Sequence, residues 1–138
     1  MTAQTARTAK DTKILVIDDE DMNIIVLTKV LMRNGYEVIS AKNGREGIAK
    51  ATLPPQPDII LMDLMMPEIN GWDATKSLKT NSQTMHIPIF AVTALTTEHQ
   101  AAIEFGFDGF CEKPIDFNLL IDLLENIRKK TGNSKLPK

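Results

Sequence analysis

Residues 13–18 have the sequence KILVID, a continuous apolar run of strand length that ends on an acid. Similar apolar runs occur at residues 58–62 (DIILM) and 87–92 (IPIFAV). A strand that is apolar on both faces belongs to a sheet that helices cover on both sides, and such sheets are typically parallel. These three segments therefore predict the centre of a buried parallel sheet.

Helical segments alternate with these strands. Residues 21–34 place Ile24, Leu27 and Leu31 at helical spacing, and Gly35 follows at the position of a helix C-cap. Residues 116–130 have an apolar face and end in three basic residues, which suit the C-terminal end of a helix dipole. The complete prediction is strands at residues 13–18, 36–40, 58–62, 87–92 and 108–111, and helices at residues 21–34, 43–51, 71–80, 98–105 and 116–130.

Five strand–helix pairs in succession predict parallel strands joined by right-handed crossovers. Five pairs are too few for an eight-stranded barrel. We therefore expect an α/β fold of the flavodoxin-like, doubly wound (βα)5 type, with a five-stranded parallel sheet in the order 2-1-3-4-5. Residues 13–130 would form this domain, and residues 1–12 and 131–138 would be flexible tails.

Length and composition exclude several classes of protein. A chain of 138 residues forms one domain, and its net charge of −2 gives no overall basic field to attract nucleic acid or anionic lipid. The single cysteine, Cys111, excludes an internal disulfide. The chain has no apolar run of membrane-spanning length and no signal-like apolar segment at its start. We therefore expect a cytoplasmic protein without membrane or nucleic-acid contact.

Polar residues occur where four of the five strands end. The first strand leads into Asp18 and Asp19, the third into Asp63, the fourth into Thr93, and the fifth runs on to Lys113. Ligands of open parallel sheets bind at the carboxyl ends of the strands, where the strand order reverses. In the order 2-1-3-4-5 these four strands are neighbours, so the sequence predicts one crevice with three carboxylates, a hydroxyl and an ammonium group.

This set of groups fits phosphoryl transfer. Carboxylates placed close together repel one another and favour a hard cation with oxygen ligands, such as Mg²⁺. A carboxylate beside such a cation can attack a phosphoryl group. The charge on the phosphoryl oxygens would then be stabilised by the cation, by Lys113 and by the Thr93 hydroxyl. The inferred reaction is the formation and hydrolysis of an aspartyl phosphate.

Four motifs carry a resemblance to a known family. They are ILVIDDED at 14–21, DLMMPEING at 63–71, AVTA at 91–94 and GFDGFCEKP at 106–114. In order and spacing they resemble the receiver domains of response regulators in two-component signalling, over residues 12–130. Because few residues follow the last helix, we expect the stand-alone, single-domain type.

The resemblance implies a phosphoacceptor and a metal site. Asp63 would take a phosphoryl group from a phosphohistidine of a sensor or hybrid histidine kinase, or of a phosphotransfer protein in a phosphorelay. Asp19, Asp63 and the backbone carbonyl of Met65 would bind Mg²⁺ directly, and Asp18 would bind it through water. Such a protein catalyses its own phosphorylation and slow dephosphorylation, and is not an enzyme with a separate substrate.

The resemblance also implies a conformational switch. Thr93 would hydrogen-bond the new phosphoryl oxygen, and Lys113 would pair with the phosphoryl group. The Lys113–Pro114 peptide bond would be cis. Phe110 takes the position of the switch aromatic, which changes rotamer when Thr93 moves.

Two departures from the family pattern affect these expectations. Many receivers have tyrosine where this chain has Phe110, so this switch residue has no hydroxyl to offer a partner. Met65 and Leu95 stand at two positions that flank the phosphoryl site, and neither side chain can orient an attacking water molecule. We therefore expect slow hydrolysis of the aspartyl phosphate.

The expected output is a protein contact. The surface formed by the predicted elements at 98–105, 108–111 and 116–130 lies beside Thr93 and Phe110. A downstream protein, or a second copy of the chain in a homodimer, would bind there.

Three other functions fit the sequence less well. A magnesium-dependent phosphatase or mutase has its nucleophile and a second acid in Asp-x-Asp after the first strand, whereas the nucleophile here follows the third strand and Met65 stands in place of the second acid. A flavin-mononucleotide binder needs a neutral, hydroxyl-rich loop where this chain has DDED. A receiver that is not phosphorylated would lose one of the five polar residues, and all five are present.

Overall fold

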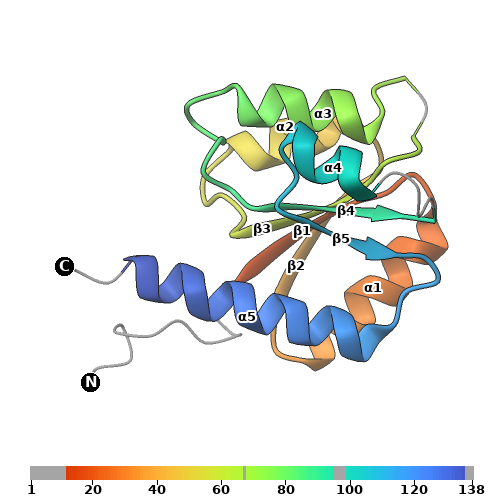
Figure 1. Cartoon of the computed structure of the whole chain (residues 1–138). Helices are drawn as coiled ribbons and strands as arrows, with labels where there is room; N and C mark the ends of the chain where they lie inside the picture. Colours follow the sequence, from red (N-terminus) through yellow and green to blue (C-terminus); the bar gives the residue numbers. More distant parts are fainter. Residues whose placement is uncertain (1–11, 67, 95–98, 136–138) are drawn as a thin grey trace.

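The computed structural model describes residues 12–66, 68–94 and 99–135, without the side chains of residues 99, 100 and 130–135. A central sheet lies between two layers of helices (Figure 1). The strands are β1 (Lys13–Ile17), β2 (Glu37–Ala41), β3 (Ile59–Asp63), β4 (Ile89–Thr93) and β5 (Gly109–Glu112). The helices are α1 (Asp21–Arg33), α2 (Gly44–Thr52), α3 (Gly71–Lys79), α4 (His99–Phe105) and α5 (Phe117–Lys135).

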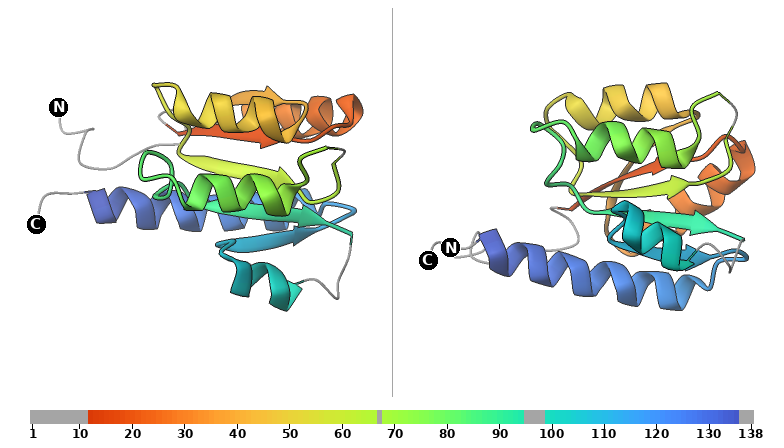
Figure 2. Two further views of the ribbon diagram at one scale, coloured as in Figure 1. Left: turned by 90° about the horizontal axis from the view of Figure 1, so that it is seen from above. Right: turned by 45° about the horizontal axis from the view of Figure 1, so that its top comes forward.

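The five strands are parallel and lie in the order β2-β1-β3-β4-β5. Helices α1 and α5 cover one face of the sheet, and α2, α3 and α4 cover the other (Figures 1 and 2). The predicted doubly wound α/β fold and its strand order are therefore confirmed. The strand order reverses at β1, between its neighbours β2 and β3, so the carboxyl ends of β1 and β3 form the expected crevice.

The core consists of two apolar layers, one on each face of the sheet. In β1, Leu15 and Ile17 point into the layer on the side of α2 and α3, while Ile14 and Val16 point into the layer on the side of α1 and α5. Every residue of β3 and β4 is buried. Burial on both faces is the physical reason that these strands are apolar throughout and do not alternate with polar residues.

Several element boundaries differ from the prediction. Asp63 and Thr93 are the last residues of β3 and β4, where we expected them directly after the strands. Helix α5 continues past the expected end at residue 130 to Lys135, and the chain allows this because its next proline after Pro114 is Pro137.

Thr12, which we placed in the N-terminal tail, belongs to the folded domain. It is buried, and its carbonyl oxygen accepts a hydrogen bond of 3.0 Å from the Glu37 amide at the start of β2. The rest of the two expected tails, residues 1–11 and 136–138, lies outside the described residues. Among the described residues, no helix is both long enough and apolar enough to span a bilayer.

Candidate functional site

Three carboxylates meet at the carboxyl edge of the sheet. Asp18 and Asp19 follow β1 and Asp63 ends β3, and these two strands are paired neighbours. One carboxylate oxygen from each of the three lies within 4.8 Å of the others. Asp18 and Asp63 are only 2% and 4% exposed, whereas Asp19 is exposed to solvent. The predicted acidic cluster is therefore present, with two of its members shielded from water.

Two of these carboxylates, Asp19 and Asp63, border an open cavity of about 380 Å³. Its walls come from the ends of β1, β3 and β4 and from the segment after β5. The lining residues are Asp19, Glu20, Asp63, Met65, Thr93, Ala94 and Lys113. Topology alone brings these groups together, because the carboxyl ends of parallel strands share one edge of the sheet.

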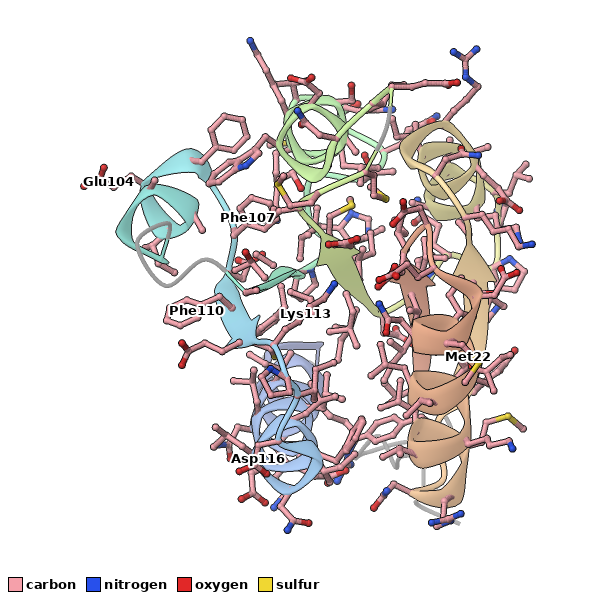
Figure 3. All side chains as sticks on the ribbon, turned by 90° about the vertical axis from the view of Figure 1, so that its right-hand side faces the viewer. Met22, Glu104, Phe107, Phe110, Lys113 and Asp116 are labelled. Carbon is pink, nitrogen blue, oxygen red and sulfur yellow. The ribbon has the colours of Figure 1, made fainter. Side chains whose placement is uncertain are left out.

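Lys113 places a positive charge beside the acids. Its Nζ lies 3.4 Å from Asp63 Oδ1 and 3.8 Å from Asp18 Oδ2. The Lys113 amide donates a hydrogen bond of 2.9 Å to the Thr93 carbonyl, and the Lys113–Pro114 peptide bond is cis. Figure 3 looks onto this edge of the sheet and shows Lys113 near the centre of the molecule, with Phe110 farther out beside α4.

The environment of Asp63 raises the pKa of its carboxyl from 3.8 to about 6. The largest cause is burial, followed by the negative charge of Asp18. The Lys113 ammonium and the Met65 amide, which donates to Asp63 Oδ1 at 3.2 Å, offset part of this effect. Asp63 is thus a carboxylate at neutral pH whose charge is only partly neutralised by the protein.

The donor set fits a magnesium ion. The clustered groups are three carboxylates that offer only oxygen atoms, and the cavity leaves room for the water ligands that Mg²⁺ retains. The incomplete neutralisation of Asp63 gives a cation a favourable place to bind. The ligands that we predicted as direct, including the Met65 carbonyl, stay predictions.

The segment after Asp63 packs tightly against the acceptor strand. A Cβ atom on Gly71 would lie 2.4 Å from the Asp63 carbonyl oxygen, so only glycine lets α3 begin this close to the strand. The Asn70 side chain caps α3 by accepting a hydrogen bond of 2.9 Å from the Asp73 amide. Glu68 has a φ of 64°, in the left-handed region of the backbone. Steric exclusion of a Cβ atom therefore explains why the motif has glycine at position 71.

The remaining predicted residues lie around the cavity. Thr93 and Met65 both line the cavity. Thr93 is only 2% exposed to solvent, whereas Met65 is 66% exposed. Phe110 does not line the cavity and is half-buried, packed against the core layer on the α4 side. Leu95 lies outside the described residues.

Two residues of the site had no predicted role. Glu20 lines the cavity, and the Asn23 amide donates hydrogen bonds to Asp18 Oδ2 at 3.2 Å and to Glu20 Oε1 at 2.9 Å. The only sequence signal was the three-residue spacing of Glu20 and Asn23 at the start of a helix, where such residues face each other.

A doubly wound sheet with an acidic cluster and a lysine at its switch point defines the receiver class. The family model for the response regulator receiver domain matches residues 14–125. The chain belongs to this family, and it is a receiver domain of two-component signalling.

Similar proteins agree with this assignment. Protein PilH of Pseudomonas aeruginosa is 32% identical over 117 residues, which cover 83% of this chain and 96% of PilH. The polar-differentiation response regulator DivK of Brucella anthropi is 30% identical over 115 residues, which cover 82% of this chain and 93% of DivK.

Solved structures with this fold include a response regulator and the receiver domain of a histidine kinase. The chemotaxis response regulator CheY4 of Vibrio cholerae has a TM-score of 0.77 and 30% identity, and the match covers 84% of this chain and 98% of CheY4. The receiver domain of the sensor histidine kinase PA1611 from Pseudomonas aeruginosa has a TM-score of 0.76 and 26% identity, covering 83% of this chain and 95% of that domain. That structure has a magnesium ion coordinated in its active-site cleft.

Proposed function

We propose that this chain accepts a phosphoryl group on Asp63 from a phosphohistidine and passes the signal on by protein contact. The observation that carries the proposal is the position of Asp63. Its buried carboxylate reaches an open cavity between the acidic cluster and Lys113. The donor would be a sensor or hybrid histidine kinase, or a phosphotransfer protein.

The hydrogen bonds of Asp63 favour one of its oxygens as the nucleophile. Oδ1 accepts from the Met65 amide and lies beside the Lys113 ammonium, so Oδ2 is the oxygen left for attack. Oδ2 would form the new oxygen–phosphorus bond as the nitrogen–phosphorus bond of the phosphohistidine breaks. The electron pair of the broken bond stays on the imidazole nitrogen.

The groups around Asp63 would stabilise the transferred phosphoryl oxygens. Lys113 supplies a fixed positive charge, and the Thr93 hydroxyl would donate a hydrogen bond. Magnesium, when bound, supplies further positive charge to the phosphoryl oxygens. Asp19, Asp63 and the Met65 carbonyl would hold it directly. Asp18 would act through water, which fits the hydrogen bonds that both of its oxygens already accept.

Labelling with a small phosphodonor tests this function. Acetyl phosphate with Mg²⁺ should phosphorylate the purified protein on an acid-stable, base-labile site. Addition of EDTA should stop the reaction. The aspartyl phosphate should then decay slowly, because Met65 at the cavity mouth has no polar group to orient water. Labelling that is equally fast in EDTA would contradict the proposed role of the cation.

A protein donor has an apolar surface to bind beside the site. Helix α1 begins next to the acidic cluster and exposes four apolar side chains, and Figure 3 shows Met22 on its outer side. The exposed fractions are 67% for Met22, 46% for Ile25, 39% for Val26 and 59% for Met32. Ile25, Val26 and Met32 follow Met22 by three, four and ten residues, which keeps all four side chains near one side of the helix.

Replacing Ile25 by serine should slow phosphotransfer from the protein donor about fivefold, as loss of an interface side chain typically does. Labelling by acetyl phosphate should be unchanged, because Ile25 lies outside the cavity lining. The two rates are measured with radiolabelled donors, using the kinase or phosphotransfer protein found by phosphotransfer profiling. Met85→Ser, at another exposed apolar residue, is the control. If Ile25→Ser slowed phosphorylation equally with both donors, the substitution would impair the phosphoryl-transfer step and not the binding of the protein donor.

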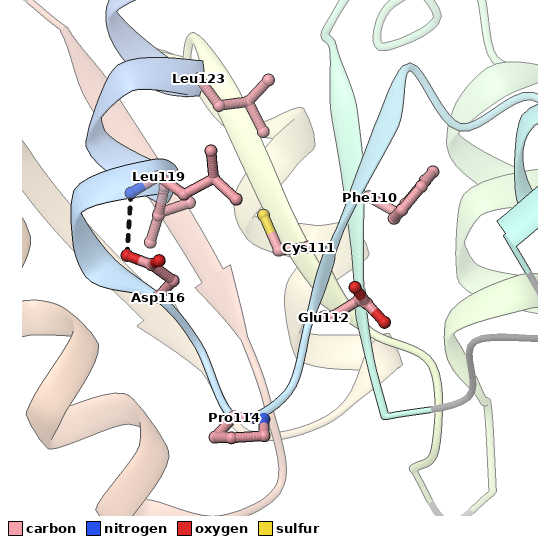
Figure 4. A pocket seen from close by; sticks show the side chains of 8 residues that line it. Phe110, Cys111, Glu112, Pro114, Asp116, Leu119 and Leu123 are labelled. Atoms are coloured by element: carbon pink, nitrogen blue, oxygen red, sulfur yellow. Dashed lines mark hydrogen bonds between the residues drawn. The ribbon is translucent and has the colours of Figure 1, made fainter.

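The output surface would be formed by α4, β5 and α5. A groove of about 320 Å³ lies between β5 and α5 (Figure 4). Leu119 on its α5 side is 66% exposed, and its backbone amide donates a hydrogen bond of 3.2 Å to Asp116 Oδ1. The lining residues are Phe110, Cys111, Glu112, Pro114, Asp116, Leu119, Leu120 and Leu123. A downstream protein or a second copy would bind this surface.

Thr93 would couple phosphorylation to this surface. Thr93 and Phe110 lie on the neighbouring strands β4 and β5, so an inward movement of Thr93 opens space that Phe110 can fill. Thr93→Ala should still bind the phosphate mimic beryllofluoride, but the resulting NMR shift changes at Phe110, Leu119 and Leu123 should fall to about half or less. Thr28→Ala on α1 is the control. Shift changes identical to those of the wild type would rule out this coupling.

A further inference from the structure

Asn23 connects two carboxylates at the site. Its side-chain amide donates to Asp18 Oδ2 at 3.2 Å and to Glu20 Oε1 at 2.9 Å. A carboxylate accepts hydrogen bonds and cannot donate them, so only the nitrogen of the Asn23 amide can face both groups. One side chain of α1 thereby contacts two acids that precede the helix.

Glu20 depends on Asn23 for its position. It is the N-cap residue of α1, yet its side chain makes no capping hydrogen bond. Its carboxylate instead accepts from Asn23, and the residue lines the cavity together with Asp19 and Asp63. A solvent-exposed glutamate without this bond would sample several rotamers, many of them directed away from the cavity.

Asp18 depends on Asn23 much less. It is 2% exposed, and its Oδ1 already accepts a hydrogen bond of 2.9 Å from the Glu20 backbone amide. Its Oδ2 also lies 3.8 Å from the Lys113 ammonium. Loss of the Asn23 amide would therefore release Glu20 while Asp18 stays in place.

We infer that Asn23 is a positioning residue that holds the Glu20 carboxylate at the cavity, where it strengthens the binding of a divalent cation by the acidic cluster. The inference rests on the proposed function, because it assigns Glu20 to the same cation site. Glu20 acts through its charge and is not required as a direct ligand. A unit charge near a divalent cation at a wet protein surface changes the binding constant about fivefold.

The test measures the Mg²⁺ dissociation constant by calorimetry at neutral pH and fixed ionic strength. The proteins are wild type, Glu20→Gln, Asn23→Leu and the double variant. Glu20→Gln should bind Mg²⁺ about fivefold more weakly. Asn23→Leu, which has a similar size but no donor, should bind about threefold more weakly. In the Glu20→Gln background, Asn23→Leu should cause no further loss, because the group that Asn23 positions is no longer charged.

Asp21→Asn is the matched control. Asp21 is an exposed acid in the first turn of α1, it pairs with Lys42 at 3.1 Å, and it does not line the cavity. Asp21→Asn removes one negative charge, as Glu20→Gln does. If Asp21→Asn binds Mg²⁺ within about twofold of the wild-type affinity, net charge alone does not explain the weaker binding by Glu20→Gln.

Melting curves in EDTA separate positioning from a purely structural role. If Asn23 only stabilised the fold, Asn23→Leu would melt lower but bind Mg²⁺ as tightly as the wild type, and this result would overturn the inference. An equal loss of affinity from Asn23→Leu in both backgrounds would also overturn it, because Asn23 would then not act through Glu20. The proposed function fails separately, if the wild type binds no Mg²⁺ or if Asp63→Asn leaves its affinity unchanged.

Discussion

Replacing Asp63 by asparagine should reduce phosphate incorporation to background with acetyl phosphate and with a phosphorylated protein donor. The asparagine amide has nearly the same shape as the carboxylate but is not a nucleophile for phosphorus, so no acyl phosphate can form. Because Asp63 is 4% exposed and lies in a closely packed strand, the similar size of asparagine should preserve the fold. The measurement is radiolabel incorporation with Mg²⁺, followed by acid and base treatment.

Asp122→Asn is the control for this experiment, because Asp122 is an exposed acid on α5 outside the cavity. It should be labelled as fast as the wild type. Undiminished labelling of Asp63→Asn would show that the phosphate is attached elsewhere and would remove the basis of the proposed function.

The same substitution should stabilise the protein in EDTA at neutral pH. The folded structure raises the pKa of Asp63 to about 6 from 3.8, so the folded state favours the protonated carboxyl. The stability that this group contributes is fully present below about pH 4 and is lost as the pH rises through about 6. Ionisation of Asp63 therefore costs the folded wild type up to about 3 kcal/mol at pH 7.5, and Asp63→Asn avoids this cost.

For a domain of this size, about 3 kcal/mol corresponds to a rise in melting temperature on the order of 10 °C. Thermal unfolding of both proteins in EDTA at pH 7.5 and pH 4 measures it. The variant should melt higher at pH 7.5, and the two melting temperatures should converge at pH 4. Free Mg²⁺ at about tenfold above its dissociation constant should stabilise the wild type by about 1.4 kcal/mol and the variant by less. A variant that melts lower than the wild type at pH 7.5 would show that Asp63 does not destabilise the fold.

The acid cluster could be predicted because its position follows from topology. Asp18 and Asp63 come at the ends of apolar strands, and strands that alternate with helices must be parallel, so their ends meet at one edge. The same reasoning placed Lys113 and Thr93 beside the acids. The functional roles of these residues came from the family resemblance, and those roles stay predictions.

Contacts between side chains that are distant in sequence could not be predicted. Trp72 at the start of α3 packs edge-on against Phe105 of α4, at a centroid distance of 5.1 Å, and against Phe107 at 5.5 Å. No pattern in the sequence pairs these three rings. Their contact depends on how α3 and α4 pack side by side on the same face of the sheet (Figure 2).

The sequence by itself determined the alternation of strands and helices, the strand order and the set of polar residues at one edge of the sheet. These features follow from hydrophobic periodicity and chain connectivity, which are properties of the order of the residues. Only the tertiary structure decided which acids are buried, which oxygen of Asp63 accepts the Met65 amide, and that the Asn23 amide donates to both Asp18 and Glu20. Burial and hydrogen-bond geometry depend on atoms contributed by several segments at once, and residue order alone does not contain their distances.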